Sequence, residues 1–249
     1  YPTHMIRITE ENKIVTLTLN RAGKRNSLSA KMIDAIHEGL DEIEKNDEMR
    51  VLILAGEGRS FCAGMDLKSV IDDPPAMGTM LQGLGRVSQR LRAIPVPTIA
   101  RVQGAAIGGG CGLMVVCDFA FTHPESKVGY PEVDLGICPA VVAPWLMKKI
   151  GPGKARAMLL AGGTITGQQG FEAGLATHLC DVDDLPTAVN DFALNLAKGG
   201  KEALATTKHW LNELDGSLDD EILQKAANLS AEIVASDEAL SRLRPLYTK

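Results

Sequence analysis

Residues 103–112 read QGAAIGGGCG and directly follow an apolar run, Thr98 to Val102. A loop of similar design, GEGRSFCAGMDL at residues 56–67, overlaps the end of the apolar run Val51 to Gly56. The run from Val51 to Gly56 is typical of a strand buried on both faces. In α/β proteins the carboxyl ends of parallel strands form the edge at which ligands bind. The two loops therefore predict an α/β fold with a ligand site at one edge of its sheet.

The small residues of both loops suit a site built from main chain. Glycine has no Cβ, so a ligand can touch the backbone. A helix that begins in the glycines at 108–110 would present N–H groups without acceptors at the positive end of its dipole. One N–H from each loop could hold the oxygen of an enolate, and a single donor of this kind contributes about 2.7–4 kcal/mol to transition-state stabilisation. The alternative is that the glycines only permit tight turns and close helix packing.

Residues on either side of the loops extend the α/β pattern. Residues 14–19 alternate as a half-buried strand does, and Ser29 is suited to cap a helix with apolar residues at helical spacing. The expected elements are a hairpin of strands near 6–9 and 14–19, a helix from Ser29 to Ile43, a helix from about Met77 to Ile94 ended by Pro95 and Pro97, and strands at 119–122 and 127–129.

The pattern changes beyond about Asp184. Three helical patterns follow, at 186–197, 202–214 and 218–235. We therefore expect an α/β core over residues 5–185, which binds the ligand and performs the chemistry. We expect a helical module over residues 186–249, which mediates oligomerisation and covers the active site.

Composition excludes several classes of protein. The chain has 249 residues, of which 45% are hydrophobic and 25 are glycine, with a formal net charge of −5. This charge gives no positive field to gather nucleic acid, and no apolar run reaches the length of a membrane-spanning helix. The five cysteines form no C-x-x-C pair, which favours buried thiols in a reducing, cytoplasmic compartment over disulfides or a metal site. We interpret residues 1–4, which precede Met5, as a cloning remnant.

Three segments together resemble the signature stretches of the enoyl-CoA hydratase/isomerase (crotonase) family. They are residues 61–67, residues 104–111 running on to Cys117-Asp118, and residues 129–136, which read GYPEVDLG. The resemblance implies a crotonase-like spiral of repeated ββα units with a helical C-terminal trimerisation module, assembled as a homotrimer or a dimer of trimers. It also implies an acyl-CoA thioester as substrate, from fatty acid or branched-chain amino acid degradation. CoA then arrives as part of the substrate, and no separate cofactor is expected.

The resemblance implies roles for individual residues. The backbone N–H groups of Met65 and Gly109 correspond to the oxyanion hole, and Glu132 corresponds to a catalytic carboxyl that moves protons. The expected contacts with the CoA thioester are Arg25, Ala63, Met65, Asp66, Leu67, Lys68, Gly109 and Gly110. The acyl chain would lie against residues 77–84 and 144–146, unless these belong to the core.

The sequence departs from the family at one catalytic position. Members with two catalytic glutamates place one just after the glycine triplet, where this chain has Gly112. With Glu132 alone, moving the double bond of an enoyl-CoA is the simpler chemistry, because one group can remove and return the proton. Asp134 lies on the same side of an extended segment and is a candidate second acid, with a structural cap as its alternative.

Three functions therefore stay open. Residues 135–144 resemble methylglutaconyl-CoA-hydratase-like members that also lack the first acid, which makes hydration of a 2-enoyl-CoA the leading prediction. The enzymatic alternative is a Δ3-Δ2 enoyl-CoA isomerase with Glu132 as its only proton shuttle. A non-catalytic acyl-CoA-binding protein is the alternative from another class.

Overall fold

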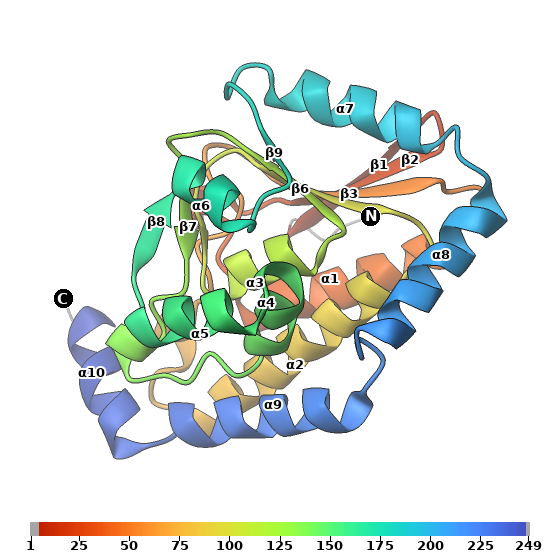
Figure 1. Ribbon diagram of the computed structural model, residues 1–249. Coiled ribbons are helices and arrows are strands. Elements are labelled where there is room, and N and C mark those ends of the chain that lie inside the picture. Colours follow the sequence, from red (N-terminus) through yellow and green to blue (C-terminus); the bar gives the residue numbers. More distant parts are fainter. Residues whose placement is uncertain (1–4, 248–249) are drawn as a thin grey trace.

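The computed structural model describes residues 5–247, so residues 1–4, interpreted above as a cloning remnant, lie outside the described residues, as do residues 248–249. A six-stranded sheet crosses the molecule, and a three-stranded sheet lies beside it (Figure 1). In spatial order the large sheet contains β1 (Ile6–Glu11), β2 (Ile14–Leu19), β3 (Val51–Gly56), β4 (Thr98–Val102), β6 (Phe119–Thr122) and β9 (His178–Leu179). The small sheet contains β5 (Ala106–Ile107), β7 (Lys127–Gly129) and β8 (Thr164–Thr166).

The large sheet begins with the predicted hairpin and then becomes parallel. Strands β1 and β2 pair antiparallel, whereas β2, β3, β4, β6 and β9 pair with their neighbours in parallel. All six residues of β3 are buried, because alternate side chains pack on opposite faces of the sheet. Leu52 and Leu54 join the main core, while Val51 and Ile53 join a smaller core on the other face. This confirms the prediction of a strand buried on both sides.

Three helices cover the face of the sheet that carries the main core: α1 (Ala30–Ile43), α2 (Pro74–Ala93) and α3 (Gly109–Val116) (Figure 1). The Ser29 hydroxyl caps α1 as predicted, accepting a hydrogen bond from the Met32 N–H at 3.3 Å. Helix α2 begins at Pro74 and not near Met77 as predicted. The Asp73 carboxylate accepts the Ala76 N–H, and a proline in the first turn has the helical φ already fixed.

The C-terminal part contains four helices where three were predicted: α7 (Leu185–Leu196), α8 (Lys201–Leu214), α9 (Asp220–Val234) and α10 (Asp237–Tyr247). Helix α7 lies on the opposite face of the sheet, where Leu185, Val189 and Ala193 pack in the smaller core (Figure 1). Helix α9 lies along α2, with Ala231 so near Gly78 that a Cβ there would be 3.0 Å away. Helix α10 escaped prediction because only Ala239 and Leu243 are buried, which leaves little apolar periodicity.

No secondary structure was predicted for residues 143–174, which form α4 (Ala143–Ile150), α5 (Pro152–Ala161), β8 and α6 (Gly167–Ala173). All five cysteines are free, but Cys138 and Cys180 are only partly buried, which corrects the expectation that all five are core residues. Cys138 lies in a cavity wall, and Cys180 follows a short strand at the sheet edge. In the described part of the chain no helix combines the length and the hydropathy needed to cross a bilayer.

Candidate active site

The two glycine-containing loops lie side by side because they leave neighbouring parallel strands. Their backbones are joined directly: the Cys62 N–H donates to the Ala105 carbonyl at 2.9 Å, and the Ile107 N–H donates to the Cys62 carbonyl at 3.0 Å. Gly110 lies under this junction, where a Cβ would be 2.2 Å from the Cys62 carbonyl oxygen. The close backbone approach expected from the sequence is therefore present, and it requires glycine at this position.

Each loop contributes to a common cavity one residue whose backbone N–H has no acceptor among the described residues. A short bridge holds the first loop, in which the Leu28 N–H donates to the Gly64 carbonyl and the Asp66 N–H donates to the Leu28 carbonyl. Met65 lies between these bonds, and its own N–H donates to no acceptor among residues 5–247. Gly109 is the first residue of α3, and its N–H also has no acceptor in that range. Both residues line one cavity of about 150 Å³, which can thus offer two unused donors to a carbonyl oxygen.

Glu132 supplies the carboxyl group of the same cavity. It follows β7 and precedes the short 3-10 helix η3 (Val133–Leu135), so its side chain comes from the second sheet. Its Oε1 lies 3.0 Å from the point where a Cβ on Gly108 would be, and Gly108 has φ +55. Its Oε2 is buried without a hydrogen-bond partner within the described residues, and burial raises the pKa of this carboxyl to about 7. Such a group can both accept and donate a proton near neutral pH.

The remaining cavity wall is mainly apolar. Leu81 and Leu84 line it, whereas Met77, from the same expected acyl segment, is fully buried in the core. Of the segment 144–146, no residue lines this cavity. The C-terminal helices contribute Ser230, Val234 and Tyr247. The complete lining is Ala63, Gly64, Met65, Leu67, Leu81, Leu84, Ile107, Gly108, Gly109, Pro131, Glu132, Leu135, Ile137, Cys138, Pro139, Val141, Val142, Ser230, Val234 and Tyr247.

The structure shows why position 112 has no acid. A Cβ on Gly112 would lie 2.5 Å from Cγ1 of Val142, so the valine side chain already fills the space beside it. Asp134 does not replace the missing acid. Its carboxylate accepts the Gly163 N–H at 2.8 Å and does not line the cavity, so the structural alternative for this residue is the correct one.

Restoring an acid at position 112 alone is expected to fail. Gly112→Glu should destabilise the fold by about 1–3 kcal/mol through overpacking against Val142, with no gain in hydratase activity. The double change Gly112→Glu with Val142→Ala should recover most of that stability. Urea unfolding and hydration assays on both variants measure these effects. A fully stable single variant would contradict the packing of Val142 against Gly112.

The predicted CoA contacts separate into two groups. Ala63, Met65, Leu67 and Gly109 line the cavity together with Glu132. The others do not line it: Arg25 and Lys68 are exposed, Asp66 is half-buried and Gly110 is covered by Cys62.

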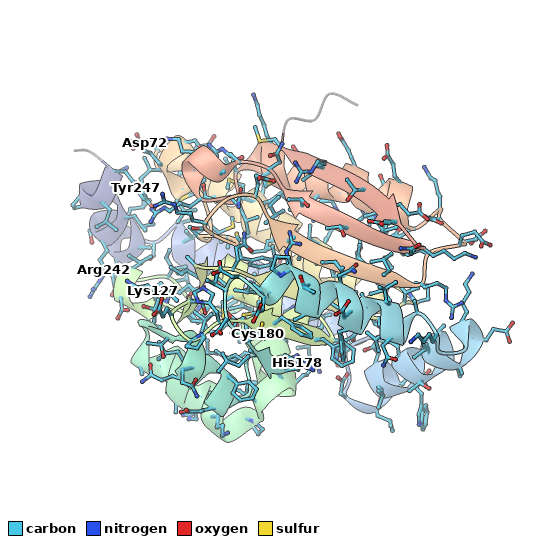
Figure 2. The ribbon with its side chains drawn as sticks, turned by 90° about the horizontal axis from the view of Figure 1, so that it is seen from above. Asp72, Lys127, His178, Cys180, Arg242 and Tyr247 are labelled. Carbon is cyan, nitrogen blue, oxygen red and sulfur yellow. The ribbon has the colours of Figure 1, made fainter. Side chains whose placement is uncertain are left out.

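Arg21 and Tyr247 were missed as neighbours of the site. Arg21 pairs with Asp66 at 2.7 Å and also donates to Ser27, which holds the first loop in place. Tyr247 comes from α10 and lies on the same side of the molecule as Asp72, in the segment before α2 (Figure 2). An Arg244–Asp72 ion pair of 3.5 Å attaches α10 to that segment. The Asn20-Arg21 pair after a strand predicts a loop, but it does not predict that Arg21 pairs with Asp66. Nothing in the sequence around Tyr247 predicts that this residue lines the cavity.

Comparisons with known proteins agree with this geometry. The model of the enoyl-CoA hydratase/isomerase family matches residues 9–240. The 1,2-epoxyphenylacetyl-CoA isomerase of Escherichia coli is 31% identical, over 96% of this chain and 96% of that protein. The crotonyl-CoA hydratase of Syntrophomonas wolfei is 30% identical, over 84% of this chain and 81% of that protein.

Solved structures show the same fold. A crystal structure of an enoyl-CoA hydratase/isomerase from Mycobacterium paratuberculosis superposes with a TM-score of 0.89 at 22% identity, covering 98% of this chain and all of that one. The predicted crotonase-like α/β architecture is therefore confirmed. The family match spans most of the chain, including both backbone-donor loops and Glu132. The chain therefore belongs to the enoyl-CoA hydratase/isomerase family.

Proposed function

We propose that this protein adds water to a 2-enoyl-CoA thioester, with Glu132 as the group that moves the proton. One observation carries the proposal: a carboxyl with a pKa of about 7 and an unpartnered oxygen shares a cavity with two unused backbone N–H groups. This combination suits a reaction that develops negative charge on a carbonyl oxygen while a proton moves nearby. A binding protein without catalysis would need neither the buried carboxyl nor its raised pKa.

The steps follow from these groups. The thioester oxygen accepts hydrogen bonds from the Met65 and Gly109 N–H groups. The Glu132 carboxylate takes a proton from water, whose oxygen bonds to C3 while the C2–C3 π electrons move toward the thioester to give an enolate. The donors stabilise the enolate, and the protonated Glu132 then gives its proton to C2. One water is consumed, the carboxylate is regenerated, and a single carboxyl completes the cycle.

A second candidate function is isomerisation of a 3-enoyl-CoA to a 2-enoyl-CoA. The lining of the cavity favours isomerisation. Val142 fills the space beside Gly112, and Glu132 is the one carboxyl among the described residues that line the cavity. Glu132 would remove a proton from C2 and return it to C4, while the same donors hold the dienolate. A relative named as an isomerase belongs to the same family.

Incubation in heavy water separates the two functions. The protein is incubated separately with crotonyl-CoA, 3-hexenoyl-CoA and 3-methylglutaconyl-CoA, and the masses of the products are measured by mass spectrometry. Hydration adds one D₂O to the substrate, whereas isomerisation moves the double bond without adding water and introduces deuterium only where the proton held by Glu132 exchanges with the solvent. Neither product from any of the substrates would overturn both candidates.

The pH dependence of kcat/KM should report Glu132. Its pKa is raised to about 7, so the carboxylate that acts as base becomes populated as the pH rises through 7. We expect kcat/KM to rise about tenfold per pH unit below 7 and to level off above it. Initial rates between pH 5 and pH 9 measure this profile. A flat profile across pH 6–8 would contradict the assignment of Glu132 as the base.

We also propose a homotrimer or a dimer of trimers, with CoA phosphates near the exposed Arg25 and Lys68. Helices α8 and α9 carry an unusual number of exposed large apolar side chains, which favours burial against another copy. They are Trp210, Leu211, Leu214, Ile222 and Leu229. Light scattering on the purified protein tests this assembly, and a monomer at micromolar concentration would contradict it.

A further inference from the structure

A second cavity, of about 360 Å³, lies at the opposite end of α3 from Gly109. Val115 near the end of α3 lines it, together with residues of α4 and α8, Pro97 just before β4, and Phe119 at the start of β6. None of its lining residues also lines the acyl cavity. It is therefore a separate site, for which the proposed reaction has no use.

The charges around this cavity are strongly unbalanced. Four cationic side chains line it, and Asp118 is the one lining carboxylate within the described residues. The carboxylate of Asp215 lies nearby and pairs with Arg92 at 2.6 Å. Two positive charges remain in excess even when Asp215 is counted, in a chain whose net charge is −5. The four cations are Arg92, Lys148, Lys149 and Lys208.

The two most buried lysines are held in place by the protein. Lys208 donates to the Val96 carbonyl at 2.9 Å and to the Asp118 carboxylate at 2.8 Å. Lys149 donates to the Cys117 and Asp118 carbonyls at 3.2 and 3.1 Å, and so also caps the end of α3. Burial lowers the pKa of both amines, because it removes the water that would compensate their positive charges. An anion in the cavity would supply that compensation without moving either lysine.

Trp145 lies in the wall of the same cavity. Its side chain is 2% exposed, and its indole N–H has no acceptor within residues 5–247. The nitrogen itself has almost no accessible surface, so an anion in the cavity would act on it through the electric field and not by a direct hydrogen bond.

We propose that this cavity binds a compact oxyanion of the phosphate or small polycarboxylate type. Four cations and their excess charge around one cavity suit an anion with several oxygens and more than one negative charge. Ammonium groups at fixed positions recognise phosphate as point charges, and a citrate-like carboxylate offers the same chemistry. The ligand is distinct from the acyl-CoA substrate.

The two tryptophans allow a direct test. Trp210 is the other tryptophan and does not line the cavity, so its indole N–H resonance is an internal control for that of Trp145. The ¹⁵N-labelled protein is titrated with inorganic phosphate, citrate and chloride at constant ionic strength. We expect a saturable shift of the Trp145 resonance with phosphate or citrate, little change for Trp210, and no response to chloride. The oxyanion that binds with the lower Kd, phosphate or citrate, identifies the ligand class.

Matched variants decide whether the lysines bind the anion. Lys149→Met should weaken binding at least tenfold, while Lys31→Met, an exposed lysine on α1, should leave it unchanged. Lys148→Met is the second variant if Lys149→Met fails to fold, because Lys148 is less buried and donates only to the Asp215 carbonyl. A non-saturating shift, an equal shift of both indoles, or unchanged binding in the folded lysine variants would overturn the proposal.

Discussion

Glu132→Gln is expected to lower kcat/KM for the preferred enoyl-CoA by about 10³-fold, within the range of general acid–base catalysis. The amide has nearly the same shape as the carboxyl, so the backbone donors of Met65 and Gly109 stay in place. What is lost is the group that takes a proton from water and returns it to C2. Steady-state kinetics measure the change, with substrate binding by calorimetry as the control. Unchanged activity toward every acyl-CoA would contradict the proposed function and favour a binding protein.

The same substitution should stabilise the protein at high pH. The folded-state pKa of Glu132, about 7, lies above the ordinary value of 4.5, so the carboxyl's contribution to stability falls as the pH rises from about 4.5 to 7. Above pH 7 the ionised carboxyl costs about 3 kcal/mol, from 1.36 kcal/mol per pKa unit. Glu132→Gln removes that cost. Urea unfolding should therefore show a more stable variant at pH 8 and a much smaller difference at pH 5. Equal differences at both pH values would contradict the buried carboxyl.

Gly110→Ala is expected to reduce kcat/KM by at least about 100-fold, the cost of losing one oxyanion donor. An added Cβ would lie 2.2 Å from the Cys62 carbonyl oxygen and 2.8 Å from its Cβ, so the two loops must separate. Because Met65 and Gly109 come from different loops, separation moves their N–H groups apart. Alanine is otherwise the better helix former, so a loss of stability must come from this contact.

Gly23→Ala is the matched control for Gly110→Ala. A Cβ on Gly23 meets no atom within 4 Å, and its backbone is not in the left-handed region. We expect wild-type activity and unfolding free energy from Gly23→Ala, and losses of both from Gly110→Ala. Kinetics and urea unfolding on both variants provide the measurement. Normal activity in Gly110→Ala would show that the spacing of the two loops does not control the reaction.

Much of the fold was predictable from local patterns. Alternation identified the hairpin of β1 and β2, a continuous apolar run identified β3, and a serine before helical spacing identified the start of α1. Helix α10 and residues 143–174 were missed, because their elements are short or bury few side chains. Their positions depend on neighbours far away in the chain, such as the contact of Arg242 with Gly136.

The candidate site divides in the same way. The meeting of its two loops follows from the sequence, because the carboxyl ends of parallel strands lie at one edge of a sheet. The roles of Met65, Gly109 and Glu132 were predicted from the family resemblance, because glycine runs by themselves also suit tight turns and close packing. Only the tertiary structure decides the space, the hydrogen-bond partners and the burial of these groups. It fills the space beside Gly112 with Val142, binds Asp134 to Gly163 and encloses Glu132 among apolar walls. These outcomes depend on burial by residues distant in the chain, and burial sets both the available space and the pKa.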